Sequence, residues 1–166
     1  LQVARDEGYA IVTLDDVVER LRSRRTGRFA AFTFDDGYRD NLTIALPVFR
    51  AHSAPLAVYV ATGLVDRTAS FWWGAMARVV ETAEVIDLRA LGAGAVVPTR
   101  SWPEKQAAFA RLEAWVHGDL ETRSTAVPDW CRAHGIDERT ELDTAMLTWA
   151  DVQAMADDPL VTIGAH

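Results

Sequence analysis

Two adjacent aspartates, Asp35 and Asp36, are the residues of this sequence best suited to do chemistry. They follow an apolar, β-prone segment and precede Gly37 in the stretch FAAFTFDDGYRDN. Successive residues of a regular strand point to opposite faces, so both carboxylates can serve one site only if the strand ends there. An unpaired carboxylate in a core is costly, and glycine permits a sharp bend. The pair is therefore predicted to lie at an open, solvated strand end.

His166 is the second candidate, because it ends another apolar segment, VTIGAH. In parallel α/β folds, functional groups collect at the carboxyl ends of the strands. An aspartate and a histidine that converge there can bind a divalent metal such as zinc, which accepts oxygen and nitrogen ligands. The other carboxylate can then act as a base. Lone Asp and His pairs at such spacing are common, so the positions alone leave a metal site open.

The elements that must position these groups alternate between strand and helix. Extended segments are predicted at 9–12, 29–34, 54–63 and 160–163, and helical spacing follows the first of them. A helix is expected over 40–52, where Pro47 implies a kink or a late start. The segment APLAVYVATG is apolar nearly throughout, as expected for a strand covered on both faces. The pattern predicts an α/β fold with a parallel sheet or barrel.

The segment between these parts, about 67–146, has mostly helical patterns. Ser70 is a plausible cap for the helix that begins SFWWGAM, and Phe109, Leu112 and Val116 share one face of a later helix. The Gly-rich stretch LRALGAGAVVPTR is compatible with a short strand between loops. This segment is expected to form helices rather than barrel strands, with that apolar face buried.

Composition limits the possible functions. The 166 residues, 18.3 kDa and 49% hydrophobic content fit one globular domain. There are 17 basic and 24 acidic residues, a net charge of −7 and no basic stripe, which argues against a nucleic-acid partner. No apolar run reaches the roughly 20 residues of a membrane span, and the first residues lack the pattern of a signal peptide. Cys131 is the only cysteine and is expected to be buried. Cellular location and oligomeric state are left open.

Two of these motifs carry a family resemblance. TFDDGYRDN resembles the first motif of the polysaccharide deacetylases, carbohydrate esterase family 4 with the NodB-homology fold. VTIGAH resembles the approach to their second motif, His-Ser/Thr-x-x-His. Similarity also extends through GYAIVTLDDVVERL, APLAVYVATGLVD and LTWADVQAMADD. The resemblance implies the N-terminal half of a distorted (β/α) barrel, with barrel parts at 8–66 and 147–166 and a helical insertion at 67–146. Residues 1–166 would then be a single, incomplete catalytic domain.

Roles follow from this resemblance residue by residue. Asp35 matches the catalytic base, Asp36 the metal-binding aspartate and His166 the first metal-binding histidine. The second histidine and the later motifs would fall beyond His166, so the 166-residue chain alone is expected to be inactive. The implied cofactor is Zn²⁺, with Co²⁺ or Ni²⁺ as alternatives. The implied reaction is hydrolysis of an acetamide on an amino sugar of a polysaccharide or oligosaccharide.

Further candidates and rival functions remain. Candidate substrate contacts are Tyr38 and Arg39 beside the aspartates, and Trp72 and Trp73, which stack on sugar rings or simply pack. Arg39 is also expected to orient the loop. A non-catalytic glycan-binding or scaffolding relative is the main alternative. A haloacid dehalogenase-type phosphatase fits less well, because its two aspartates are separated by one residue.

Overall fold

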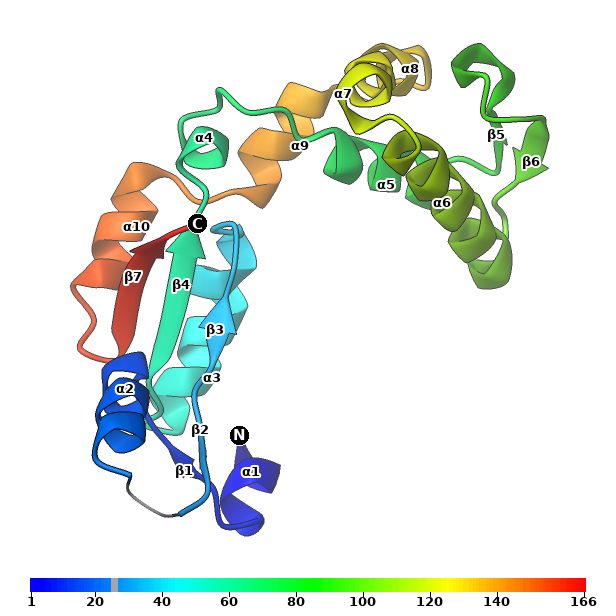
Figure 1. The fold of residues 1–166 in the computed structure, drawn as a ribbon. Helices are drawn as coiled ribbons and strands as arrows, with labels where there is room; N and C mark the ends of the chain where they lie inside the picture. Colours follow the sequence, from blue (N-terminus) through cyan, green and yellow to red (C-terminus); the bar gives the residue numbers. More distant parts are fainter. Residues whose placement is uncertain (25–26) are drawn as a thin grey trace. The chain divides into compact units, whose positions relative to one another are not determined.

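The computed structural model describes residues 1–24 and 27–166. The chain divides into two compact units (Figure 1). Residues Leu1–Ala69 and Ala145–His166 form the first, called here the sheet unit, and residues Ser70–Thr144 form the second, called the helical unit. Each is described by itself.

The sheet unit contains only parallel strand pairs among its described residues. One sheet pairs β1 (Ala10–Ile11) with β2 (Phe29–Ala30), and the other has the order β3 (Thr33–Phe34), β4 (Leu56–Val60), β7 (Val161–Ala165). In Figure 1 the arrows of β3, β4 and β7 point in the same direction, and those of β4 and β7 end together. The predicted parallel α/β arrangement is therefore confirmed for this unit.

The predicted strand over 29–34 is divided into β2 and β3. The amide of Val12 donates to the carbonyl of Ala30, whereas the amide of Ala57 donates to the carbonyl of Phe32. The extended chain thus changes partner between these positions, from β1 to β4. Side-chain alternation shows that a segment is extended but does not identify its partner strand, which explains the error in the predicted bounds.

Capping residues determine where two helices of the sheet unit begin. Thr13 forms a capping box with Asp16 at the start of α2 (Leu14–Arg22), and Thr148 forms one with Asp151 at the start of α10 (Trp149–Ala156). A π-helical turn, η1 (Asn41–Ala45), runs directly into α3 (Leu46–Ala51), which has Pro47 in its first turn. The chain is already helical before Pro47, so the helix does not start late; a π-helical turn interrupts its regular α-helical geometry instead. The remaining helices are α1 (Gln2–Asp6) and α4 (Thr62–Val65).

The core of the sheet unit lies around β4, in which all residues except the half-buried Tyr59 are buried. A strand covered on both faces is typical of a parallel sheet between helices. The cluster consists of Leu46, Phe49, Ala54, Leu56, Val58, Val60, Val65, Leu147, Val152 and Met155. This core fixes the strand whose carboxyl end faces the candidate site.

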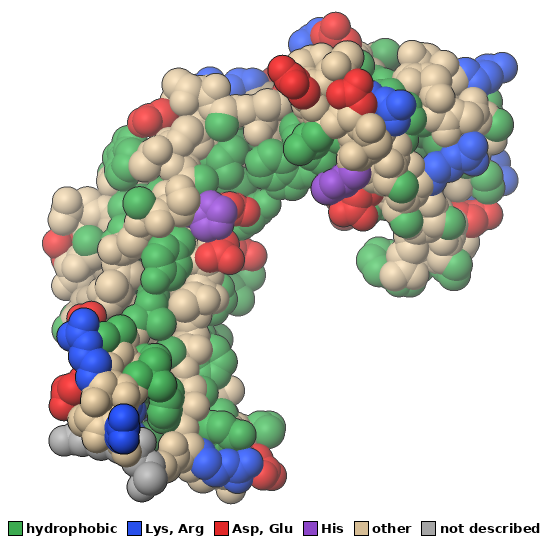
Figure 2. Space-filling view, viewed as in Figure 1, with side chains coloured by type: hydrophobic (Ala, Val, Ile, Leu, Met, Phe, Trp, Pro, Cys, Tyr) green, Lys and Arg blue, Asp and Glu red, His purple; other side chains and the backbone are tan. Residues whose placement is uncertain are grey.

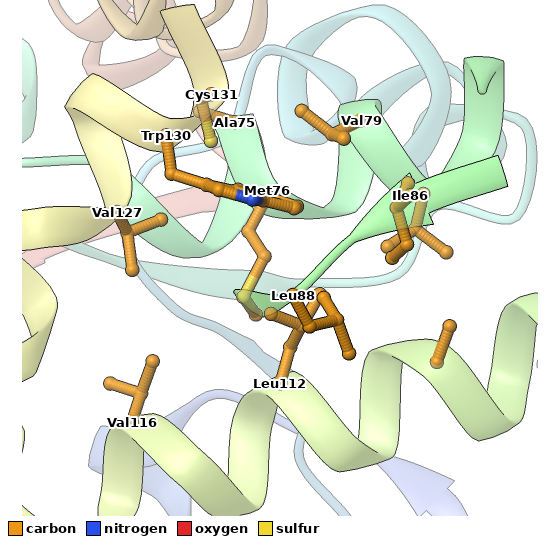
Figure 3. Packing of buried hydrophobic residues seen from close by; sticks show 12 residues of the cluster. Ala75, Met76, Val79, Ile86, Leu88, Leu112, Val116, Val127, Trp130 and Cys131 are labelled. Carbon is orange, nitrogen blue, oxygen red and sulfur yellow. The ribbon is translucent and has the colours of Figure 1, made fainter. Parts of the chain in front are cut away.

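The helical unit has its own core (Figure 3). Its elements are α5 (Trp72–Thr82), β5 (Val85–Asp87), η2 (Arg89–Leu91), β6 (Val96–Pro98), α6 (Trp102–His117), α7 (Leu120–Arg123), η3 (Ser124–Ala126), α8 (Val127–Ala133) and α9 (Glu138–Ala145), whose last residue belongs to the sheet unit. Leu112 and Val116 of α6 are fully buried in one cluster with Met76, and Trp130 is buried there as well. Phe109 packs against this cluster while partly exposed. The strands β5 and β6 are antiparallel. Cys131 is buried, as predicted.

The predicted cap at Ser70 is wrong. The N-cap of α5 is Phe71, and no side chain caps this helix. The Ser70 hydroxyl instead donates to the Glu138 carboxylate at 2.6 Å, and the Phe71 amide donates to the same carboxylate. Hydrogen bonds to a charged carboxylate are stronger than those between neutral groups. The Ser70 hydroxyl therefore bonds to Glu138 and does not cap the helix.

The surface agrees with the composition. On the face drawn in Figure 2, Lys and Arg side chains are scattered among acidic ones and form no continuous band in the described part of the chain. None of the helices within 1–24 and 27–166 is both long and apolar enough to cross a bilayer.

Candidate active site

The structure brings Asp36 and His166 together at the carboxyl end of the three-stranded sheet. Asp36 follows β3, and His166 follows β7 directly. The amide of His166 donates to the carbonyl of Val60 at 3.0 Å, which extends the pairing of β7 with β4 by one residue. The imidazole Nδ1 of His166 lies 3.8 Å from Oδ1 of Asp36. The two groups are neighbours because parallel strands end at the same edge.

The backbone around the aspartates forms a strained turn. Asp36 has φ 67° and Gly37 has φ 83°. Such angles cost little for glycine but are unfavourable for aspartate, and strained residues of this kind cluster at functional sites. The Gly37 amide donates to the carbonyl of Asp35 at 2.8 Å, which tightens the turn. The bend assigned to Gly37 therefore includes Asp36 as well.

Two other segments hold this turn from outside. The carbonyl of Asp36 accepts from the amide of Ala61 at 3.2 Å, and the carbonyl of Gly37 accepts from the amide of Leu147 at 3.0 Å. Ala61 follows β4, whereas Leu147 precedes α10. The conformation of the aspartate turn thus depends on residues that are far apart in the sequence.

The exposure of the polar groups differs. The Asp36 side chain is 31% exposed and the His166 side chain 50%, and Asp35 is exposed. Water therefore reaches Asp35, while Asp36 is partly enclosed beside the imidazole. This difference separates two adjacent carboxylates that are chemically identical in the unfolded chain.

The separation of Asp36 and His166 suits a shared metal ion. Two ligands at zinc bond lengths of about 2.0–2.1 Å in tetrahedral geometry lie about 3.4 Å apart. The observed 3.8 Å is only slightly longer. In the described part of the chain, no cluster of three or more His, Cys, Asp and Glu residues could hold a metal. The residues present therefore fit two positions of a metal site.

The two substrate-contact candidates near the turn, Tyr38 and Arg39, both contact Met146. Tyr38 is half-buried and bridges to Met146, and the Arg39 guanidinium donates to the carbonyl of Met146 at 3.1 Å. Arg39 therefore links the aspartate loop to the segment at Met146, and its role toward substrate stays a prediction.

Trp72 and Trp73 belong to the helical unit and make packing contacts there. Their rings meet edge to face with centroids 5.6 Å apart, and Trp73 meets Phe71 in the same way at 5.1 Å. Trp72 also packs against the core of this unit. Both rings therefore have packing contacts, and a substrate contact of Trp72 or Trp73 stays a prediction.

Sequence reasoning missed two residues near the turn. Arg67 has φ 63° and donates four hydrogen bonds to backbone carbonyls. Asn41 is 4% exposed, and its Nδ2 has no hydrogen-bond partner among the described residues. The burial of Asn41 has no sequence signal beyond its place in the motif, and the contacts of Arg67 depend on tertiary structure.

These observations define an α/β protein with an Asp and His pair at the carboxyl end of a parallel sheet. Residues 22–166 match the protein family described as polysaccharide deacetylase. This chain belongs to that family, so the resemblance noted in its motifs is confirmed. None of the curated proteins matches the sequence.

Two solved structures are similar to the chain. One is a de-N-acetylase from Aggregatibacter actinomycetemcomitans, with 16% identity, a TM-score of 0.47, and coverage of 98% of this chain and 40% of that one. The other is the BpsB deacetylase domain from Bordetella bronchiseptica, with 18% identity, a TM-score of 0.49, and coverage of 99% and 40%. The chain thus spans about two fifths of the length of both.

Proposed function

We propose that the protein containing this chain is a metal-dependent hydrolase that removes acetyl groups from N-acetylated amino sugars of a polysaccharide. The observation that supports this most directly is the 3.8 Å separation of Asp36 and His166 beside the exposed Asp35. Membership of the polysaccharide deacetylase family supports the substrate class.

The two aspartates have separate tasks in this proposal. Asp36 and His166 would hold a divalent ion, with zinc as the first candidate and cobalt or nickel as alternatives, because one oxygen and one nitrogen ligand suit all three. When bound, the ion supplies Lewis-acid polarisation of the acetamide carbonyl. Asp35 accepts a proton from the attacking water, since its carboxylate is exposed to solvent. Water oxygen bonds to the carbonyl carbon, the carbon–nitrogen bond breaks as the amine nitrogen takes up the proton that Asp35 received from water, and acetate and the free amine leave.

We further propose that the sheet unit is part of a distorted (β/α) barrel. Its three adjacent parallel strands support this, because parallel strands joined by helices are the building units of such barrels. Residues 8–66 and 147–166 would then be barrel parts of one catalytic domain, and 67–146 an insertion between them.

The test uses the full-length protein with acetylated glucosamine oligomers and added zinc. Asp36→Asn is expected to abolish metal binding measured by calorimetry. Asp35→Asn is expected to retain the metal and lose roughly 10²-fold or more of the rate of acetate release, because a general base typically contributes that much. Asp40→Asn, which changes an exposed aspartate directly before η1, is the matched control and should leave both quantities unchanged.

Two results would overturn the proposal. Equal loss of metal in the Asp35 and Asp36 variants would show that the division of tasks is wrong. Oligomer binding by the wild-type protein without acetate release, at saturating zinc, would instead identify a non-catalytic glycan-binding relative.

A further inference from the structure

The strained turn at Asp36 and Gly37 is closed into a ring of hydrogen bonds. Ala61 binds the carbonyl of Asp36, and Leu147 binds the carbonyl of Gly37. Ala61 directly precedes α4, and Leu147 lies just before α10. The turn is thus bonded to the segment before α4 and to the segment before α10. These links form a closed ring only if α4 is also bonded to the segment at Leu147.

The side chain of Arg67 makes that connection. Its Nη1 donates to the carbonyls of Leu64 and Val65 at 2.7 and 3.1 Å, at the end of α4. The same atom donates to the carbonyl of Leu147 at 3.0 Å, and Nη2 donates to that of Met146 at 3.2 Å. A planar guanidinium with five donors can bridge two backbone segments in fixed geometry, which the rotating ammonium of lysine does not reproduce.

The turn needs such support because Asp36 is held at φ 67°. A non-glycine residue stays in this region only when its surroundings fix it from several sides. The ring supplies two of these constraints, one on each carbonyl of the turn. Without it, Asp36 would be free to relax to negative φ, and its carboxylate would turn away from His166.

We propose that Arg67 is a positioning residue of the active site. It acts through the backbone of α4 and Leu147, and it keeps Asp36 in the conformation that directs the carboxylate toward His166. The expected effect of Arg67 on catalytic turnover rests on the proposed function. Its expected effect on the conformation of the aspartate turn does not.

The direct test is hydrogen–deuterium exchange on the full-length protein without added metal. Arg67→Met is expected to speed exchange at the amides of Ala61 and Leu147 by about tenfold or more, because the segments that carry these amides would no longer be held against their acceptors, the carbonyls of Asp36 and Gly37. Arg50→Met is the matched control. Arg50, in α3, pairs at 2.5 Å with Asp158, which precedes β7, and neither residue belongs to the ring. It should leave these two amides unchanged. Unchanged exchange in Arg67→Met would overturn the proposal.

Arg67→Lys separates geometry from charge. If the ring requires the guanidinium fork, the lysine variant should behave like Arg67→Met. Wild-type exchange in Arg67→Lys would show that a positive charge is sufficient and would overturn the geometric argument. The lysine variant also decides the question if Arg67→Met does not fold.

Kinetics give a second readout. Arg67→Met is expected to lower kcat for acetate release by about 10- to 100-fold, the range typical of groups that orient metal ligands, with KM within about twofold. An equal fall in kcat for Arg50→Met would indicate general destabilisation and overturn the positioning role. A wild-type protein without turnover would refute the proposed function, and the exchange data would still decide the role of Arg67.

Discussion

Replacing Gly164 with alanine is expected to disturb the candidate site through the strand that carries His166. Gly164 pairs with Tyr59 across β7 and β4, and a Cβ at this position would lie 2.7 Å from Cε1 and 2.8 Å from Cδ1 of the tyrosine ring. Normal carbon contacts are about 3.5–4.0 Å, so the ring or the strand must move by roughly 0.8 Å. Overpacking of this kind costs about 1–3 kcal/mol of unfolding free energy.

The same displacement should weaken metal binding. Functional groups must be held within about 0.5 Å of their working positions, and His166 is only two residues beyond Gly164. We expect Gly164→Ala to raise the dissociation constant for zinc about tenfold in calorimetric titration of the full-length protein. Thr162→Ala, at an exposed position of β7, is the control and should change neither stability nor affinity.

A double-mutant cycle with Tyr59→Ala identifies the cause. Removing the ring makes room for the new methyl group, so the two substitutions should show a favourable coupling of about 1 kcal/mol or more in denaturant unfolding. Additive costs, or a Gly164→Ala variant as stable as wild type, would refute the steric reasoning.

Two further predictions concern titrating groups. Hydrogen bonds from the Leu160 amide and from Arg50 lower the pKa of Asp158, so the folded state binds this proton less readily than the unfolded state. The stability from Asp158 is therefore present above its unfolded pKa of about 3.9 and is lost as pH falls below it, and the difference in unfolding temperature between wild type and Asp158→Asn should shrink below about pH 4. Burial raises the pKa of Cys131 to about 12, so a thiol-reactive dye at pH 8 should label it only at the rate of unfolding, and immediate labelling would contradict this.

Local signals predicted those parts of the fold that depend on neighbouring residues. The capping box at Thr148 and the buried strand β4 both follow from residues within a few positions of each other. The convergence of Asp36 and His166 was predictable for another reason, since parallel strands bring their carboxyl ends to one edge.

Features that depend on distant partners were not predictable from the sequence. Ser70 has the composition of a cap, but a carboxylate 68 positions further along the chain binds its hydroxyl. The segment 29–34 is extended throughout, yet its partner changes from β1 to β4. Glycine explained the bend after β3, but the positive φ of Asp36 is maintained by Ala61 and Leu147, and no local pattern marks either residue.

The junctions of the helical unit suggest how this chain tolerates a long intervening segment. The indole of Trp149 donates to the Asp66 carboxylate at 2.7 Å, next to the contacts of Arg67 with Met146 and Leu147. These residues all belong to the sheet unit, so the two points where the chain leaves and returns are tied together without help from the residues between them. The entropy cost of bringing together the two ends of an intervening segment grows only slowly with the length of that segment. We therefore expect the aspartate turn to keep its conformation when residues 70–144 are lengthened, shortened or exchanged.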